Sequence, residues 1–220
     1  WVLRRRAEQI SLVRGFDTLI SLDSINILHY SYQIETARTA LNKMRGQVIL
    51  ADEVGLGKTI EAGIIIKELI LRGLARRILI LTPASIVGQW RGELYNKFGE
   101  RFIEGRKPEH FREQKVIASL DTAKGNNNSE AALERPWDML VIDEAHHLKN
   151  RHTKAYAFVN KIRKKYALFL TATPVHNNLT ELYALITLVK PGLLGTIRSF
   201  KRQFVDPVDP RKPANEAHLK

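Results

Sequence analysis

Residues 52–59 read Asp-Glu-Val-Gly-Leu-Gly-Lys-Thr, an order of residue types suited to holding a chain of phosphates. Glycines let backbone N–H groups turn inward around a phosphate, and a helix starting here would add the positive end of its dipole. We expect Lys58 to reach the β- and γ-phosphates of ATP and the Thr59 hydroxyl to sit on Mg²⁺. Asp52 stands where the common phosphate-loop pattern has glycine, so a chance loop is the alternative. The expected nucleotide-binding residues are Glu53, Val54, Gly55, Leu56, Gly57, Lys58, Thr59 and Ile60.

A second segment, Asp-Glu-Ala-His at 143–146, follows an apolar run and could complete the same chemistry. Phosphoryl transfer depends mainly on positioning and charge neutralisation. We expect Asp143 to hold magnesium through water, and Glu144 to orient and deprotonate the attacking water. A solvated acidic pair in a loop is the alternative, and the upstream phosphate loop argues against it. Metal binding by His146 and His147 is disfavoured because adjacent side chains diverge, so we expect His146 to link the acidic pair to the next motif.

That next motif is Leu-Thr-Ala-Thr-Pro at 170–174, again directly after an apolar run. We expect the hydroxyls of Thr171 and Thr173 to hydrogen-bond the acidic pair and to sense the γ-phosphate. A simple threonine-rich turn is the alternative.

The elements that must position these residues alternate along the chain. Short apolar runs predict strands, and segments of helical spacing follow them. Continuous apolar strands separated by helices indicate an α/β fold with a mostly parallel sheet covered on both faces. Ligands of such sheets bind beyond the carboxyl ends of the strands, where these motifs fall. The predicted strands are 48–51, 78–81, 116–119, 139–142 and 167–170, and the predicted helices are 60–71, 87–98, 156–164 and 179–189.

Three stretches fit this alternation poorly. Residues 99–114 carry little strand signal and are expected to be a loop or an abbreviated part of the fold. Residues 125–129, Gly-Asn-Asn-Asn-Ser, predict a polar turn. Residues 179–189 form the last clear helix, and residues 206–220, with their prolines, predict an extended tail.

Composition narrows the class of protein. The 220 residues are 44% hydrophobic, which is enough for a full core, and they include no cysteine. No apolar window approaches the ~18 residues of a membrane span, and the basic start at 1–6 has no apolar segment after it. We therefore expect no signal peptide, no membrane partner and a cytoplasmic location, associated with the nucleoid in a prokaryote. The net charge of +12 favours a polyanionic partner, with an ordinary basic surface as the alternative.

Taken together, the segments resemble the superfamily-two helicases, and within them the Swi/Snf-type DNA translocases. The similarity is greatest to the bacterial branch that includes the RNA-polymerase-recycling ATPase, in which an acid at the position of Asp52 is typical. The resemblance covers residues 27–205 and implies a RecA-like ATP-binding lobe there, with an N-terminal extension at 1–26 and a linker or tail at 206–220. The stretches that carry it are 50–63, 81–90, 117–121, 143–150 and 170–178.

The resemblance also implies roles for other residues. Gln33 stands where such ATPases place a glutamine that reads adenine. Tyr30, Tyr32 or Arg38 would pack on the base, although core packing of the two tyrosines is an equal alternative. Trp90 is expected to pack its helix rather than stack on a base, and the basic runs at 161–165 and 198–202 are expected to be solvated helix faces. The residues implied to face the nucleic acid are Thr82, Pro83, Gln89, Ser119 and Asp121.

Enzymes of this kind have two RecA-like lobes, and the second supplies arginines that stabilise the transition state. The 220 residues show no second phosphate loop, so we expect this chain alone to bind nucleotide weakly and to hydrolyse it very slowly. The leading interpretation is the first lobe of a double-stranded DNA translocase. One alternative is a strand-separating DEAH-type helicase acting on DNA or RNA, which the contexts of residues 89–90 and 175–178 disfavour. The other is a non-catalytic nucleic-acid-binding module, which the intact Lys58, Asp143 and Glu144 disfavour.

Overall fold

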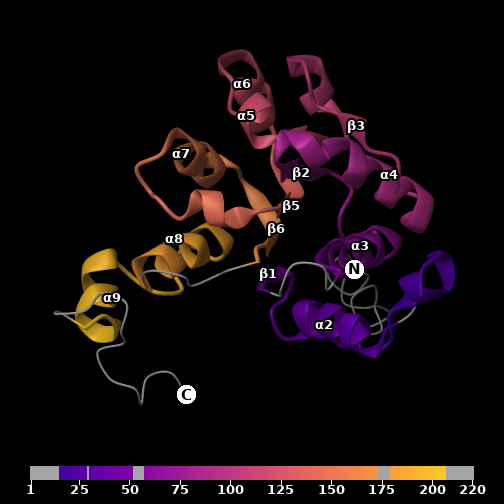
Figure 1. The fold of residues 1–220 in the computed structure, drawn as a ribbon, viewed down its shortest axis with the longest axis horizontal. Helices are drawn as coiled ribbons and strands as arrows, with labels where there is room; N and C mark the ends of the chain where they lie inside the picture. Colours follow the sequence, from indigo (N-terminus) through magenta and orange to yellow (C-terminus); the bar gives the residue numbers. More distant parts are fainter. Residues whose placement is uncertain (1–14, 29, 52–56, 173–178, 207–220) are drawn as a thin grey trace, which may run out of the picture.

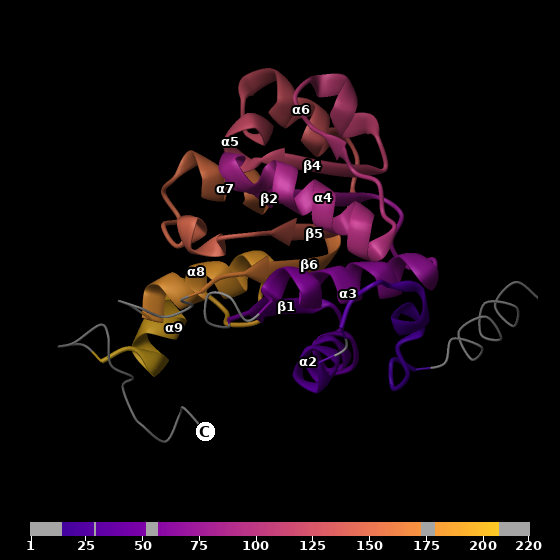
Figure 2. The ribbon, with the colours of Figure 1, turned by 45° about the vertical axis from the view of Figure 1, so that its right-hand side comes forward.

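The structure is a computed structural model that describes residues 15–28, 30–51, 57–172 and 179–206. Its centre is a sheet whose described strands run in the order β1-β6-β5-β2-β4-β3, and every pair is parallel (Figures 1 and 2). The expected α/β fold with a parallel sheet is therefore confirmed. The strands are β1 (Gln47–Leu50), β2 (Ile78–Thr82), β3 (Ile103–Glu104), β4 (Lys115–Ser119), β5 (Trp137–Ile142) and β6 (Lys164–Leu170).

Helices cover both faces of the sheet. One face carries α3 and α4, with α2 packed on α3, and the opposite face carries α5, α6, α7 and α8. Helix α9 lies beyond α8, where the rings of Phe200 and Tyr183 are 4.8 Å apart. The helices are α2 (Ser31–Asn42), α3 (Lys58–Leu71), α4 (Val87–Phe98), α5 (Leu120–Ala123), α6 (Asn126–Glu134), α7 (Lys154–Lys161), α8 (Leu179–Val189) and α9 (Ile197–Phe204). Short 3₁₀ turns are η1 (Ile20–Ser24), η2 (Ala84–Ile86), η3 (Pro108–Arg112) and η4 (Ala145–Leu148).

The two cores follow from the alternation of side chains along each strand. In β2, Ile78 and Ile80 pack with the α3 and α4 layer, whereas Leu79 and Leu81 pack with the opposite layer. All four are fully buried, so the strand is apolar at every position rather than at every second one. This is the pattern that a parallel sheet covered on both faces requires.

Helices α3 and α4 approach closely because one residue lacks a side chain. A Cβ placed on Gly63 would overlap the ring of Phe98, which is itself buried. Since α3 begins at the phosphate loop and α4 follows β2, this contact fixes the two segments relative to each other. Among the described helices, none is both long enough and apolar enough to cross a bilayer.

Several expected elements are corrected. The polar turn at 125–129 is wrong, because α6 begins at Asn126 with Gly125 as its N-cap, and it buries Ala131 and Ala132. The helix expected at 156–164 runs from Lys154 to Lys161, because Thr153 caps its start and Ile162 is already extended. The stretch 99–114 contains β3 and η3, and α9 follows the segment expected to be the last clear helix.

Candidate nucleotide and nucleic-acid site

The motifs meet at the carboxyl edge of the sheet. The backbone N–H of Asp143, just after β5, donates to the carbonyl of Leu81 in β2 at 2.9 Å. The N–H of Thr171, just after β6, donates to the carbonyl of Leu50 in β1 at 3.0 Å. Because β6 lies between β1 and β5, the segments that follow these strands share one edge within about 10 Å, given the usual spacing of strands.

The phosphate-loop side of this edge is described from Gly57 onward, and Glu53, Val54, Gly55 and Leu56 lie outside the described residues. Gly57 has φ 86° and caps the N-terminus of α3, so the chain enters the helix through a conformation that favours glycine. Lys58, Thr59 and Ile60 form the first turn of this 14-residue helix. The N–H groups of a helix start point outward and favour an anion, which agrees with the phosphate site expected here.

Gln33 reaches this turn from α2. Its side chain is buried, and its amide nitrogen would lie 2.4 Å from a Cβ on residue 57. This close approach adds to the preference for glycine that the positive φ of residue 57 sets. The same nitrogen lies 3.4 Å from the hydroxyl of Tyr32. Tyr30 and Tyr32 are about half exposed, so core packing is the wrong interpretation for both rings. The structure therefore places Gln33 at the expected nucleotide site, with two accessible aromatic rings beside it.

Asp143 is fixed from two sides. Its Oδ1 accepts the backbone N–H of Glu144 at 2.9 Å, and its Oδ2 accepts the indole N–H of Trp90 at 2.8 Å. An ionised carboxylate offers about four acceptor positions, so about two remain for other partners. Glu144 itself has φ 52° and ψ 47°, a left-handed backbone that is uncommon outside glycine and costs roughly 1–3 kcal/mol.

His146 lies beside Glu144. Its Nδ1 is 3.1 Å from Glu144 Oε2, but the angles there do not make a hydrogen bond, so the contact is electrostatic and needs a protonated ring. The rings of His146 and His147 are 4.2 Å apart, and no group of three or more potential metal-ligating side chains occurs among the described residues. The link from His146 to the threonine motif stays a prediction. Thr171 is fully buried, and Thr173 lies outside the described residues.

The hydrogen bond from Trp90 to Asp143 is a contact that the sequence did not indicate. The side chain is 1% exposed, so its expected packing role is confirmed and base stacking is wrong. A buried indole normally finds a partner for its N–H. That general rule was the only available signal, and it does not identify Asp143 as the partner. The bond joins α4, which starts close after the expected nucleic-acid residues Thr82 and Pro83, to the acidic pair.

The five residues expected to face nucleic acid divide into two groups. Gln89 and Asp121 are exposed and bond to neighbouring side chains, Gln89 to Glu93 at 2.9 Å and Asp121 to Lys124. Thr82 and Ser119 are buried, and Pro83 is half-buried. The Thr82 hydroxyl donates to the Pro83 carbonyl at 3.0 Å. The Ser119 hydroxyl caps α5 by accepting the Thr122 N–H at 3.0 Å, so these two side chains hold the turns in shape.

A cavity of about 410 Å³ connects the acidic pair with the nucleic-acid segments. It opens where the chain order reverses, between β2 and β5, which is where open α/β sheets bind ligands. Its lining combines carboxylates, two lysines and a histidine, so it can take both cationic and anionic groups. The lining residues are Thr82, Pro83, Ala84, Leu120, Asp121, Lys124, Asp143, Glu144, His147, Thr153, Lys154 and Ala155.

The parallel sheet and its edge define a RecA-like α/β lobe of the kind found in helicase-like ATPases. The family of SNF2-related domains matches residues 32–220, and the chain belongs to that family. The chain is 48% identical over 188 residues to a Bacillus subtilis (strain 168) protein named uncharacterized ATP-dependent helicase YqhH, covering 85% of this chain and 33% of that protein. It is 36% identical over 188 residues to the RNA polymerase-associated protein RapA of Pseudomonas aeruginosa (strain LESB58), covering 79% of this chain and 20% of that protein.

Among solved structures, the Sulfolobus solfataricus SWI2/SNF2 ATPase core in complex with dsDNA superimposes with a TM-score of 0.80 at 26% identity. The match covers 92% of this chain and 44% of that chain. The expected resemblance to a Swi/Snf-type first lobe is thereby confirmed. The chain spans a third or less of the length of these two curated relatives.

Proposed function

We propose that this chain is the ATP-binding lobe of a nucleic-acid-dependent ATPase that translocates on double-stranded DNA. The observation that carries the proposal is the convergence at one sheet edge. Gly57 and Lys58, with Gln33 beside them, follow β1, and the Asp143–Glu144 pair follows β5. The cavity beside that pair is also lined by Thr82, Pro83 and Asp121 from the expected nucleic-acid segments.

The donor set fits ATP with Mg²⁺. A helix start bearing Lys58 and Thr59 suits a triphosphate, and the buried amide of Gln33 suits a base edge. Asp143 keeps about two acceptor positions, enough for the waters of one hydrated ion. Mg²⁺ in such enzymes needs only one or two carboxylates because substrate phosphates and water complete its shell.

When bound, Mg-ATP supplies the transferable phosphoryl group and part of the charge neutralisation. Lys58 balances negative charge on the β- and γ-phosphate oxygens, and Thr59 contributes its hydroxyl. Asp143 is oriented by its bonds from Trp90 and from the Glu144 N–H. Glu144 accepts the proton of the attacking water, and its left-handed backbone sets the direction of its side chain.

The nucleic-acid part of the proposal rests on charge and on similarity. The chain carries +12, and the Sulfolobus core is described as a complex with dsDNA. We propose duplex DNA as the track, and in a prokaryotic cell the nucleoid as the place of action. The chain covers 44% of the Sulfolobus core, so we also propose that a second lobe completes the ATPase by contributing arginines, worth ~10³–10⁵ in rate in related phosphoryl transfer.

The test uses the protein as its gene encodes it. ATP hydrolysis should rise when duplex DNA is added, and Lys58→Ala should lower it by at least about a hundredfold because the phosphate charge is then unbalanced. Lys165→Ala is the control, since Lys165 is exposed near the amino end of β6. Unchanged activity of Lys58→Ala would favour a non-catalytic nucleic-acid-binding module instead.

A second measurement separates a translocase from a strand-separating helicase. A translocase on duplex DNA displaces a third strand from a triplex without opening a forked duplex. ATP-dependent opening of the fork would overturn the duplex translocase in favour of a DEAH-type helicase.

A further inference from the structure

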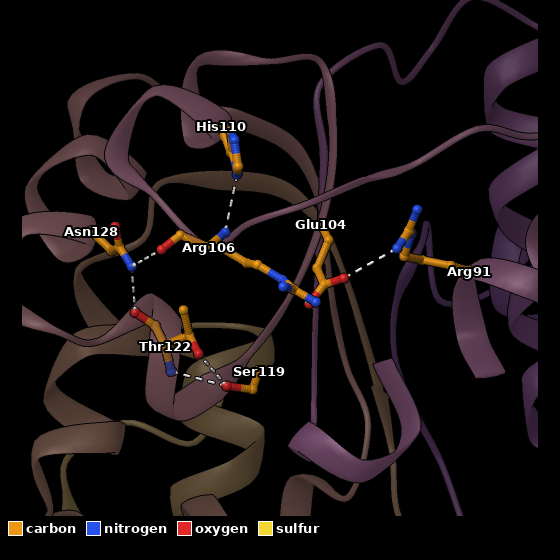
Figure 3. Close-up of polar contacts among 7 residues, drawn as sticks. All are labelled: Arg91, Glu104, Arg106, His110, Ser119, Thr122 and Asn128. Carbon is orange, nitrogen blue, oxygen red and sulfur yellow. Dashed lines mark hydrogen bonds and ion pairs between the residues drawn. The ribbon is translucent and has the colours of Figure 1, made fainter. Parts of the chain in front are cut away.

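The backbone of an exposed arginine, Arg106, is held in place by hydrogen bonds with neighbouring side chains. It follows β3, the short outer strand next to β4. The N–H of Arg106 donates to His110 Nδ1 at 3.2 Å, and its carbonyl accepts from Asn128 Nδ2 at 3.3 Å (Figure 3). The preceding Gly105 donates to the Ile117 carbonyl at 2.8 Å. A Cβ on Gly105 would come within 2.9 Å of Phe111 and Val116, so the backbone is pressed against the core.

The Arg106 side chain, in contrast, points into solvent. It is 72% exposed, and its Nε donates to Glu104 Oε1 at 2.7 Å. Glu104 Oε2 accepts from Arg91 of α4 at 3.1 Å, so one carboxylate aligns two arginines (Figure 3). Within the described residues the guanidinium of Arg106 makes one hydrogen bond, through its Nε, which leaves its other N–H groups for solvent or a ligand. Hydrogen bonding to Arg106 lowers the pKa of Glu104, so this carboxylate stays ionised near neutral pH and keeps its bonds to the two arginines.

This loop joins the two segments implied to face nucleic acid. On one side, Arg91 lies two residues after Gln89 on α4. On the other, Asn128 also donates to the Thr122 carbonyl at 3.0 Å, in the helix that Ser119 caps and that carries Asp121. Because β3 runs parallel to the other strands, Arg106 emerges at the same edge as those segments. Arg91 and Arg106 share the carboxylate of Glu104, and the next residue, Lys107, is exposed as well.

We propose that Arg106 is a backbone-phosphate contact for duplex DNA, and that it extends the nucleic-acid surface of this lobe from α4 and α5 to the outer strand β3. The proposal rests on the proposed function. An arginine fork matches a phosphate in geometry, and its alignment by Glu104 and by the fixed backbone lowers the entropy lost on binding. A phosphate contact carries no sequence information, so the residue adds affinity and register rather than base preference.

The test measures duplex binding by Arg106→Gln over a range of salt concentrations. Arg135→Gln is the matched control, because Arg135 is also exposed and paired with a neighbouring acid, Glu134, but precedes β5 at the opposite edge of the sheet. Arg106→Gln should bind roughly threefold to tenfold more weakly at low salt, and its slope of log affinity against log salt should be shallower by about 1. Arg135→Gln should match the wild type in both.

Two further variants keep the test decisive. Arg106→Lys retains the charge and should keep the wild-type slope. Glu104→Gln removes the nearby negative charge, while its amide oxygen can still accept the Nε–H of Arg106 and keep it aligned. This variant should bind duplex DNA more tightly, which is the opposite direction from Arg106→Gln. Thermal unfolding checks that each variant is folded, and a variant that fails this check leaves the other two to decide. A wild-type affinity and slope in Arg106→Gln would overturn the contact, whereas a wild-type protein that does not bind duplex DNA would overturn the proposed function itself.

Discussion

Trp90 and Asp143 show how one bond can link two motifs that lie 53 residues apart in the sequence. The indole N–H of Trp90 and the backbone N–H of Glu144 take about two of the four acceptor positions of the carboxylate and leave about two for other partners. A hydrogen bond to a charged group contributes about 1.5–3 kcal/mol to the free energy of unfolding. Removing the donor costs stability because the buried acceptor then lacks both water and a partner. The bond therefore couples the position of α4 to the orientation of the Asp143 carboxylate.

Trp90→Phe keeps most of the packed ring and removes this donor. We expect a loss of about 1–3 kcal/mol in the free energy of unfolding, measured by chemical denaturation. We also expect weaker binding of Mg-ATP, because the carboxylate is no longer aligned. Trp137→Phe is the matched control: Trp137 is equally buried and donates its N–H to the Ala132 carbonyl at 2.8 Å, at the other end of β5. If both variants lose nucleotide affinity equally, Trp90 acts through stability alone.

Lys164 sets a pH dependence of stability. Burial lowers the pKa of its amine to about 8 from the model-peptide value of 10.5. Below pH 8 both folded and unfolded chains hold the proton, and the penalty for burying the charge is complete. Between about pH 8 and 10.5 the unfolded chain binds more protons, so stability rises with pH. Lys164→Met should therefore stabilise the protein at pH 7 by roughly 1–3 kcal/mol and remove this rise, with the exposed Lys165→Met as control.

At the scale of elements, the contact between α3 and α4 determines how the phosphate-loop helix sits. Gly63→Ala places a methyl group where the buried ring of Phe98 lies, so we expect overpacking to destabilise the protein by about 1–3 kcal/mol. Gly92→Ala in the middle of α4 meets open space and should instead stabilise it by about 0.5–1 kcal/mol through helix propensity. Thermal unfolding of both variants gives the comparison. Equal effects would mean that the α3–α4 contact adjusts without cost.

The sequence predicted the elements whose signal is local. Apolar runs identified β1, β2, β4, β5 and β6, because the parts of a strand that are covered on both faces are apolar. β1 is only partly buried, and β6 begins with two lysines that the apolar run did not include. The strand β3 was not predicted, because it has only two residues and one of them, Ile103, is 43% exposed. Helix α6 was not predicted because its first residues, Asn126 to Asn128, are typical of turns. The residues that it buries, Ala131 and Ala132, come later in the helix. The edge where the motifs gather could be predicted, whereas the Trp90–Asp143 bond and the Arg106 loop depend on contacts between distant segments.

At the scale of the whole molecule, the described residues form one lobe around one sheet. We expect this 220-residue chain alone to bind ATP weakly and to hydrolyse it slowly, because arginines from a second lobe are worth ~10³–10⁵ in rate. Steady-state hydrolysis by the chain, with and without duplex DNA, measures this. A protein that also carries the proposed second lobe is the comparison, and rapid DNA-stimulated turnover by the chain alone would contradict the expectation.

The position of β1 has a consequence for local opening. In the described sheet this strand has a neighbour on one side only, β6, and its ladder is four residues long. Few bonds must break for it to detach, whereas β5, which precedes Asp143, is held between two strands. Amide hydrogens of β1 should therefore exchange with solvent earlier than those of β5. A nucleotide that contacts Lys58, after β1, and Asp143, after β5, would link these two strands across β6. It should therefore slow amide exchange in β1 more than anywhere else in the sheet.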